Sequence, residues 1–318
     1  MGFGYDIVGD IHGNKDALER LLEKLGYSST AGGVWGHPDR MAIFVGDFVD
    51  RGPEQLGTLD LVRRMISAGT AHAVMGNHEF NAIGYATEDG AGSHMRARTE
   101  KNRAQHEAFL REVGEDSAPH RETIAFLKTL PFFFETEGLR VVHACWHQPS
   151  VDAVRPYLDR QGLLPEAWWP TALRKESKLG YAVDVLLKGP ELDLPDGRTF
   201  VDKDGHERAA VRVKWWDLGA TTYRRAAITV PGDAVGDLPD ERLKRDFRYW
   251  DGKPVFFGHY WMTGEPVLSS ECAACVDFSV ARPDGYLTAY RWSGERTLSP
   301  ENLVFVPANE PAPALARP

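Results

Sequence analysis

The N-terminal part of the chain repeats one pattern three times: a short apolar stretch, a polar loop and a segment with helical spacing. The apolar stretches Tyr5–Val8, Ala42–Val45 and Ala71–Met75 are typical of buried strands. After the first of them, leucines recur at the spacing that gives a helix one apolar face. Strands that alternate with helices are typical of α/β proteins, in which sites lie at the carboxyl ends of strands. We therefore expect an α/β fold that places the three polar loops at such ends.

The second loop carries an unusual concentration of charge. Gly46 ends the apolar stretch, and Asp47, Asp50 and Arg51 follow it closely. Two carboxylates this near to each other are costly to bury unless a cation compensates them. A metal site accounts for the grouping, although this loop taken alone fits a polar loop with a surface ion pair equally well.

Four further loops at the ends of apolar stretches carry potential metal ligands. Each histidine alone is more simply a surface or packing residue, but their common position after a strand favours one shared site. The loops offer carboxylates, imidazoles and one amide, a set that suits Mn²⁺ or iron, with Zn²⁺ as an alternative. One shared carboxylate can bridge two such ions at roughly 3.5–4 Å. The candidates in these loops are Asp10 with His12, Asn77 with His78, His143 and His259.

The composition argues against several classes of function. The formal net charge of −9 over 318 residues disfavours binding to a nucleic-acid backbone or to an anionic membrane. No apolar run is long enough to cross a membrane and no signal peptide is visible, so we expect a cytoplasmic protein. Three cysteines are too few for a disulfide framework. Cys272 and Cys275 have metal-site spacing but no second pair, and we interpret them as packing residues on a strand.

We expect one domain over residues 1–306, with a long insertion at about 148–253 and a flexible tail at 307–318. The insertion has little periodicity, and its two Trp-Trp pairs are interpreted as packing residues. Residues 85–115 are rich in charge, which indicates a solvated helical face, with steering of an anionic substrate as the alternative. The tail is rich in proline and alanine.

The loop sequences resemble the signature blocks of the calcineurin-like metallophosphoesterases, in particular the phosphoprotein-phosphatase branch that includes bacterial diadenosine tetraphosphatases. Two later histidine segments and the region around Asp277 also resemble that branch. The resemblance implies a four-layer α/β/β/α sandwich of two mixed sheets with flanking helices. The matching blocks are Gly-Asp10-x-His12-Gly, Gly-Asp47-x-x-Asp50-Arg51-Gly, Gly-Asn77-His78-Glu79, Val-Val-His143 and Phe-Gly-His259.

The resemblance implies a site for two divalent metal ions. Many members outside this branch have a second histidine where this chain has Trp261, so the first ion is expected to lack that ligand and to carry an extra water. Cys145 stands where the family usually has glycine, which predicts crowding of the site or sensitivity to oxidation. The implied ligands are Asp10, His12 and Asp47 for the first ion, and Asp47 as a bridge with Asn77, His143 and His259 for the second.

The chemistry of phosphate assigns roles beside the metals. Arg51 can grip two phosphate oxygens with its planar guanidinium, and Asn77 is a further substrate contact. His78, held by Asp50, is the best proton donor for the leaving alkoxide, because an adjacent carboxylate keeps imidazole protonated near neutral pH. Arg224, or its neighbour in the sequence, follows a Trp-x-Asp-like segment and is a candidate second phosphate contact, with a surface arginine as the alternative.

Three functions are compatible with this site. The first is a two-metal phosphoesterase that hydrolyses phosphomonoesters, as a serine/threonine-type protein phosphatase or on a small phosphoester. The second is a bis(5'-nucleosyl)-tetraphosphatase, which needs aromatic or polar groups in the insertion to seat a nucleobase. The third is an inactive protein that binds metal and senses phosphate. The intact pair of Asp50 and His78 argues against the third, because a binder needs no acid.

Overall fold

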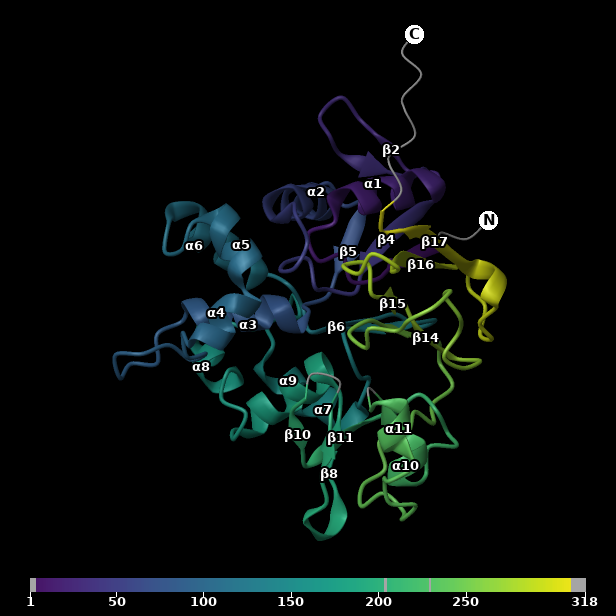
Figure 1. The fold of residues 1–318 in the computed structure, drawn as a ribbon. Coiled ribbons are helices and arrows are strands. Elements are labelled where there is room, and N and C mark those ends of the chain that lie inside the picture. Colours follow the sequence, from purple (N-terminus) through teal and green to yellow (C-terminus); the bar gives the residue numbers. More distant parts are fainter. Residues whose placement is uncertain (1–3, 203–204, 229, 310–318) are drawn as a thin grey trace.

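The computed structural model describes residues 4–309 except 203, 204 and 229. A larger and a smaller β-sheet lie face to face between helices (Figure 1). The strands of the larger sheet are β1 (Gly4–Val8), β4 (Arg40–Phe44), β5 (Ala71–Ala73), β15 (Asp277–Phe278), β16 (Tyr286–Trp292) and β17 (Leu303–Pro307). Their order is β15-β16-β1-β4-β5, with β17 paired to β16. β1, β4 and β5 are parallel, whereas β16 is antiparallel to β1, so this sheet is mixed.

The smaller sheet is also mixed. Its strands are β6 (Phe133–Glu135), β7 (Arg140–Val142), β13 (Val255–Phe257) and β14 (Ala273–Cys275). The order is β14-β13-β7-β6, in which β13 is parallel to both neighbours and β6 is antiparallel to β7. The carboxyl ends of β7 and β13 therefore lie next to each other.

Alternating side chains build the core on both faces of each sheet. Ile7 and Ile43 of the larger sheet lie in one buried cluster with Val141 and Phe256 of the smaller sheet. Phe44, one residue further along β4, belongs to the buried cluster that includes the helices. This period of two is what a strand covered on both faces requires.

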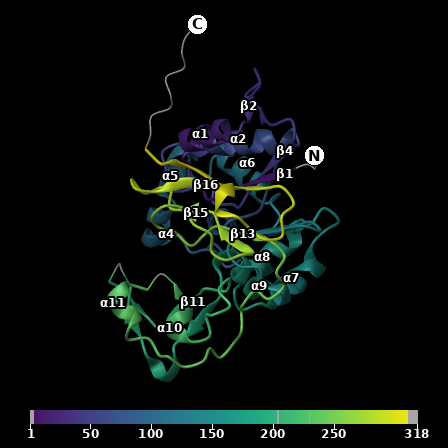
Figure 2. The same cartoon turned by 90° about the vertical axis from the view of Figure 1, so that its right-hand side faces the viewer.

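Two pairs of helices complete the layers. Helices α1 (Lys15–Lys24) and α2 (Gln55–Ser67) cover the outer face of the larger sheet, and α7 (Gln148–Val154) and α9 (Lys178–Lys188) lie against the smaller sheet (Figures 1 and 2). The predicted α/β fold, with helices flanking two mixed sheets, is confirmed.

The first predicted helix, expected over Asn14–Gly26, is α1 and is slightly shorter. Asn14 occupies the capping position, but its side chain does not cap the helix. Its Nδ2 donates instead to the carbonyl oxygens of Ile11 and His12, at 2.8 and 2.9 Å. The residue thus fastens the loop that carries His12.

The charged segment 85–115 is not solvated throughout, contrary to our prediction. The segment begins at the end of helix α3 (Asn77–Ala86), contains the short helices α4 (Glu100–Gln105) and α5 (Glu107–Val113), and leads to helix α6 (Ala118–Leu127). One side of this segment is buried, because His106, Phe109, Leu110 and Val113 have at most 5% of their surface exposed.

The insertion forms the end of the molecule away from α1 and α2 (Figures 1 and 2). Trp169, Trp215 and Trp216 are buried as predicted, whereas Trp168 is 41% exposed. Besides α7 and α9, its helices and strands are α8 (Trp169–Ala172), α10 (Tyr223–Ala226), α11 (Gly232–Val235), β8 (Glu191–Asp193), β9 (Phe200–Val201), β10 (Glu207–Arg208), β11 (Ala210–Val213) and β12 (Ala227–Ile228). β11 lies between β8 and β12, and β9 pairs with β10.

The remaining elements are short. They are β2 (Ser28–Ser29), β3 (Trp35–Gly36) and the 3₁₀ turns Arg155–Tyr157, Glu166–Trp168, Pro195–Gly197 and Pro300–Asn302. Residues 310–318 of the expected tail lie outside the described residues. Among the described residues, no helix is both long and apolar enough to span a membrane.

Candidate functional site

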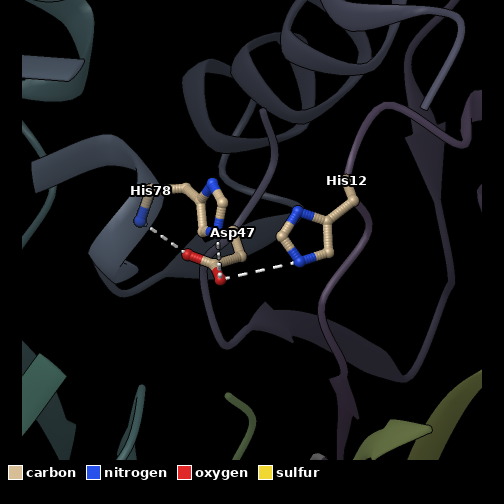
Figure 3. A group of neighbouring side chains, drawn as sticks. All are labelled: His12, Asp47 and His78. Carbon is tan, nitrogen blue, oxygen red and sulfur yellow. Dashed lines mark hydrogen bonds and ion pairs between the residues drawn. The ribbon is translucent and has the colours of Figure 1, made fainter. Parts of the chain in front are cut away.

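Asp47 lies at the centre of a group of histidines. Its Oδ2 is 3.7 Å from His12 Nε2, 3.9 Å from His78 Nε2 and 3.4 Å from His143 Nε2. Figure 3 shows His12, from the loop after β1, and His78, from the start of α3, on two sides of the Asp47 carboxylate. Two ligand atoms about 2.1 Å from one ion lie about 3–3.5 Å apart, so these spacings suit side chains that share cations.

Asn77 connects the two histidines of the smaller sheet. Its Oδ1 lies 2.9 Å from His143 Nε2 and 2.7 Å from His259 Nδ1. His143 follows β7 and His259 follows β13, so the adjacent carboxyl ends of these strands bring the two rings together. Asp47, His143 and His259 form one group of potential ligands whose atoms lie within 4.8 Å of one another, and His12, Asp47 and His78 form another.

Asp10 completes the cluster from the end of β1. Its Oδ2 accepts a hydrogen bond from the backbone N–H of His259 at 3.0 Å. Its Oδ1 is buried and, within the described residues, has no hydrogen-bond partner, as is also true of Nε2 of His12 and of His259. Buried polar atoms are normally paired, so several unpaired ligand-type atoms in one cluster fit the donor set of a metal site. The structure therefore brings together all six predicted ligand residues.

The charges of the cluster also fit bound cations. Burial, and then the carboxylates of Asp277 and Asp47, raise the pKa of Asp10 well above its usual range. Burial, and then the neighbouring His78, lower the pKa of His12 to about 3. The His12 imidazole is thus neutral, as a metal ligand must be. A bound cation would compensate the negative charge of the carboxylates around Asp10.

Asp50 holds two histidines. Its Oδ2 accepts from His78 Nδ1 at 2.5 Å, and its Oδ1 accepts from His106 Nδ1 at 2.6 Å. The predicted pairing of His78 with Asp50 is present, whereas His106 was not singled out from the sequence. Burial alone would raise the pKa of Asp50, but the hydrogen bonds from His106 and His78 hold it below its usual range.

Arg51 lies at the rim of the cluster with its side chain exposed. The guanidinium carbon is 3.6 Å from the centre of the Trp261 ring, a cation–π contact. The Trp261 ring is also 5.7 Å from the His12 ring. The residue that replaces a second histidine in this chain therefore contacts the predicted phosphate-binding arginine.

Comparison with known proteins identifies the family. The model of the calcineurin-like phosphoesterases matches residues 5–259. The chain belongs to the calcineurin-like phosphoesterases. The match spans all five loops of the site and the whole of the insertion.

Individual relatives resemble the chain over different lengths. The bis(5'-nucleosyl)-tetraphosphatase PrpE of Halalkalibacterium halodurans is 48% identical over 75 residues, which is 23% of this chain and 30% of that protein. The protein of the same name from Geobacillus thermodenitrificans is 49% identical over 79 residues, with the same two shares. The chain thus spans about a third of the length of these relatives. A protein serine/threonine phosphatase structure from Saccharomyces cerevisiae aligns with 95% of this chain and 78% of that chain, at 16% identity and a TM-score of 0.45.

The loops of this calcineurin-like phosphoesterase reach the cluster through unusual backbone conformations. His12, Asp47, Asp50, Arg51 and His259 all have positive φ, between 48° and 74°. Such conformations are unfavourable for residues with a side chain and are found where surrounding structure enforces them, often at active sites. Here these conformations gather in the loops after β1, β4 and β13 that carry the candidate site residues.

Glu79 lies in one of the matching sequence blocks, but no role was predicted for it from the sequence. It is fully buried, and its carboxylate accepts hydrogen bonds from four backbone N–H groups. Those from Asp47 and Gly76 reach Oε2 at 2.7 and 3.0 Å, and those from Phe48 and Val49 reach Oε1 at 2.8 and 3.3 Å. Glu79 therefore fixes the loop that carries Asp47 against the start of α3.

Glu79→Gln is expected to lower the free energy of unfolding by about 2–4 kcal/mol, because one carboxylate oxygen becomes an NH₂ group that faces two backbone N–H donors. Urea unfolding in the presence of a chelator measures this without a contribution from bound metal. Glu122→Gln, at an exposed position on α6, is the control and should change stability little. An unchanged unfolding midpoint in Glu79→Gln would contradict the assigned role.

Two arginines of the insertion differ in their relation to the site. Arg224 is exposed and its Nε donates to the carbonyl oxygen of Leu238 at 2.9 Å, so the structure shows no contact between Arg224 and the cluster. Arg212, on β11, was not singled out from the sequence. After burial, its positive charge is the largest influence that lowers the pKa of His259. The Nε of Arg212 donates to Glu191 Oε1 at 3.2 Å.

The cysteines do not take part in either group of potential ligands found among the described residues. Cys145 is buried, and burial raises the pKa of its thiol well above the usual value. Because the thiolate is the form that reacts, the predicted sensitivity of Cys145 to oxidation is disfavoured by this environment. Cys275 is buried on β14, in agreement with a packing role.

Proposed function

We propose that this chain is a metal-dependent phosphoesterase that binds two divalent cations. The observation that carries the proposal is the position of Asp47 between two groups of potential ligands that share its carboxylate. Asp10, His12 and Asp47 would hold one cation, and Asp47, Asn77, His143 and His259 would hold the other. The absence of thiolates from this set favours Mn²⁺ or iron, with Zn²⁺ as the alternative.

Two divalent cations held by these residues would supply positive charge against the phosphate and would make a hydroxide nucleophile available near neutral pH. The chain's own residues then bind the substrate and move a proton. Arg51, exposed beside the cluster, is placed to take two phosphate oxygens with its planar guanidinium.

His78 is the proposed proton donor to the leaving oxygen. Its Nδ1 donates to Asp50 Oδ2, which leaves the Nε2 proton free to be transferred. Burial would lower the pKa of His78, but the charge of Asp47 and the hydrogen bond to Asp50 raise it above the ordinary value. A raised pKa favours the protonated ring that a general acid requires.

The finer proposal concerns the substrate. Phosphomonoesters, including phosphoproteins, fit the single phosphate-binding arginine beside the cluster. A second candidate, hydrolysis of a dinucleoside tetraphosphate, is favoured by the names of the bacterial relatives that match at 48% and 49% identity. Both reactions use the same nucleophile and differ in the leaving group.

A substrate panel tests these proposals. Protein supplied with Mn²⁺, Fe²⁺ or Zn²⁺ is incubated with a phosphoserine peptide, p-nitrophenyl phosphate and diadenosine tetraphosphate. Faster turnover of the peptide supports the phosphoprotein proposal, and faster turnover of the dinucleotide supports the second candidate. Protein that binds the metals but hydrolyses none of the three substrates would refute the enzymatic proposal and favour a phosphate sensor.

Trp261→Ala is expected to raise the KM for a phosphomonoester about three- to tenfold with little change in kcat, because a cation–π contact of about 0.5–2 kcal/mol no longer orients Arg51. Trp261→Phe keeps an aromatic face and serves as the matched control. In both variants the backbone N–H of residue 261 can still donate to Asp277 Oδ2, a bond of 2.6 Å in the structure. A fall in kcat with unchanged KM would contradict this role.

A further inference from the structure

Asp50 is held at both oxygens of its carboxylate. His78 occupies Oδ2 and His106 occupies Oδ1, at 2.5 and 2.6 Å. The backbone N–H of Asp50 donates to Gln55 Oε1 at 2.6 Å, and the residue is 1% exposed. The two side-chain bonds orient the buried carboxylate, and the backbone bond fixes the loop that carries it.

The surroundings of His106 determine which proton it carries. The residue lies at the junction of α4 and α5, is fully buried, and has the rings of Tyr85 and Phe109 at 5.5 and 4.7 Å. A hydrogen bond from Nδ1 to a carboxylate requires the proton on Nδ1. Nε2 has no hydrogen-bond partner among the described residues, so a proton there would be a buried, unpaired N–H. His106 therefore donates through Nδ1 to Asp50 Oδ1.

We propose that His106 is a positioning residue, which holds Oδ1 of Asp50 so that Oδ2 stays directed at His78 and His78 stays aligned for proton donation. This inference rests on the proposed function, because it requires His78 to act as the acid. It assigns a role in the reaction to a helical segment that lies outside the loops of the metal cluster.

The physical reason is the cost of an unpaired carboxylate oxygen. Without the His106 donor, Oδ1 of Asp50 is buried with no partner from this segment, and the carboxylate gains by rotating or by recruiting water. Either change moves Oδ2 away from His78 Nδ1. Loss of the hydrogen-bond partner that orients a metal-binding histidine typically costs about 10- to 100-fold in metal affinity or activity, and we expect a loss of similar size where the oriented histidine is the acid.

Two polar substitutions separate positioning from packing. In His106→Asn the side-chain amide can place a donor near the position of Nδ1, whereas in His106→Gln the longer chain places it near the position of Nε2. The readout is kcat on two substrates: phenyl phosphate, whose poor leaving group needs a proton, and 2,4-dinitrophenyl phosphate, whose good leaving group does not.

We expect His106→Gln to lower kcat on phenyl phosphate about tenfold and kcat on 2,4-dinitrophenyl phosphate by less than about twofold. His106→Asn should stay near the wild-type rate on both substrates. His120→Gln is the matched control, because His120 is buried in the same helical segment and packs on the same Phe109 ring but bonds to the backbone N–H of Asp116. It should affect stability without changing the ratio of the two rates.

His78→Ala, measured in parallel, distinguishes failure of this inference from failure of the proposed function. If His78→Ala lowers the rate on phenyl phosphate selectively and His106→Gln does not, the positioning role of His106 is overturned while His78 remains the acid. Equal losses on both substrates in His106→Gln, or a loss in His106→Asn as large as that in His106→Gln, also overturn it. If His78→Ala itself shows no selectivity, the acid and its positioning residue are overturned together.

Discussion

Asp47→Asn is expected to lower kcat about 10³-fold or more and to reduce the bound metal well below the wild-type amount, since the bridging carboxylate contributes several kcal/mol of charge stabilisation. Asp47 Oδ2 lies within 3.4–3.9 Å of three imidazole nitrogens. An amide in its place is neutral and offers only one oxygen. Metal content by elemental mass spectrometry and turnover of p-nitrophenyl phosphate measure the two effects.

We expect Asp47→Asn to lose bound metal but to keep the folded structure. The backbone oxygen of Asp47 accepts from the N–H groups of Ile11 and His12, and these bonds remain in the variant. Asp47 Oδ1 accepts from the backbone N–H of His78 at 2.9 Å, which the amide oxygen can also do. Asp60→Asn, an exposed carboxylate on α2, is the matched control and should retain metal and activity. A variant of Asp47 that keeps two equivalents of metal and a rate within tenfold of wild type would rule out the bridging role.

The part of the site that the sequence predicts is the part set by strand ends. Asp10, Asp47, His143 and His259 each follow a short apolar stretch, and parallel neighbours carry such residues to the same edge of a sheet. No long-range information is needed beyond the order of the strands. The same reasoning predicts the layers, because buried strands flanked by amphipathic segments need helices on their outer faces.

Roles that depend on local hydrogen bonds were not predicted. Glu79 stands next to His78 in the sequence, yet it points to four backbone N–H groups and not to the metal cluster. One feature of the sequence could have predicted this role: Glu79 lies in the first turn of a helix capped by a glycine. A carboxylate at that position can accept hydrogen bonds from backbone N–H groups. His106 was hidden by the charged residues around it, although Phe109, Leu110 and Val113 have the spacing of a buried helical stripe.

The insertion was the least predictable part because its contacts are non-local. Trp215 Nε1 donates to the carbonyl oxygen of Ala144 at 2.9 Å and to Tyr260 Oη at 3.1 Å. The insertion is thus fastened to the residues that directly follow His143 and His259. The sequence therefore could not show where the arginines of the insertion lie, and Arg224, the candidate phosphate contact, donates in the structure to the carbonyl oxygen of Leu238.

His78→Ala is expected to keep both metals and to lower kcat by about 10²–10⁴-fold on a substrate with a poor leaving group, the range that general acid catalysis contributes. His78 Nε2 lies 3.9 Å from Asp47 Oδ2, close enough for His78 to belong to a group of potential ligands. Metal content therefore decides between a ligand and an acid. The backbone N–H of His78, which bonds to Asp47, is unchanged in the variant.

The leaving group provides the second criterion for His78. If the ring supplies a proton to the leaving oxygen, the loss of rate should shrink as the leaving group becomes more acidic, because a stable anion departs without protonation. His147→Ala is the control. It removes a partly buried histidine whose ring bonds to Ser150 Oγ, and it should cause no dependence on the leaving group. Loss of metal from His78→Ala would make the residue a ligand, and an equal loss of rate on all substrates would leave the site without an assigned acid. A selective loss with both metals retained is the combination that only a proton donor produces.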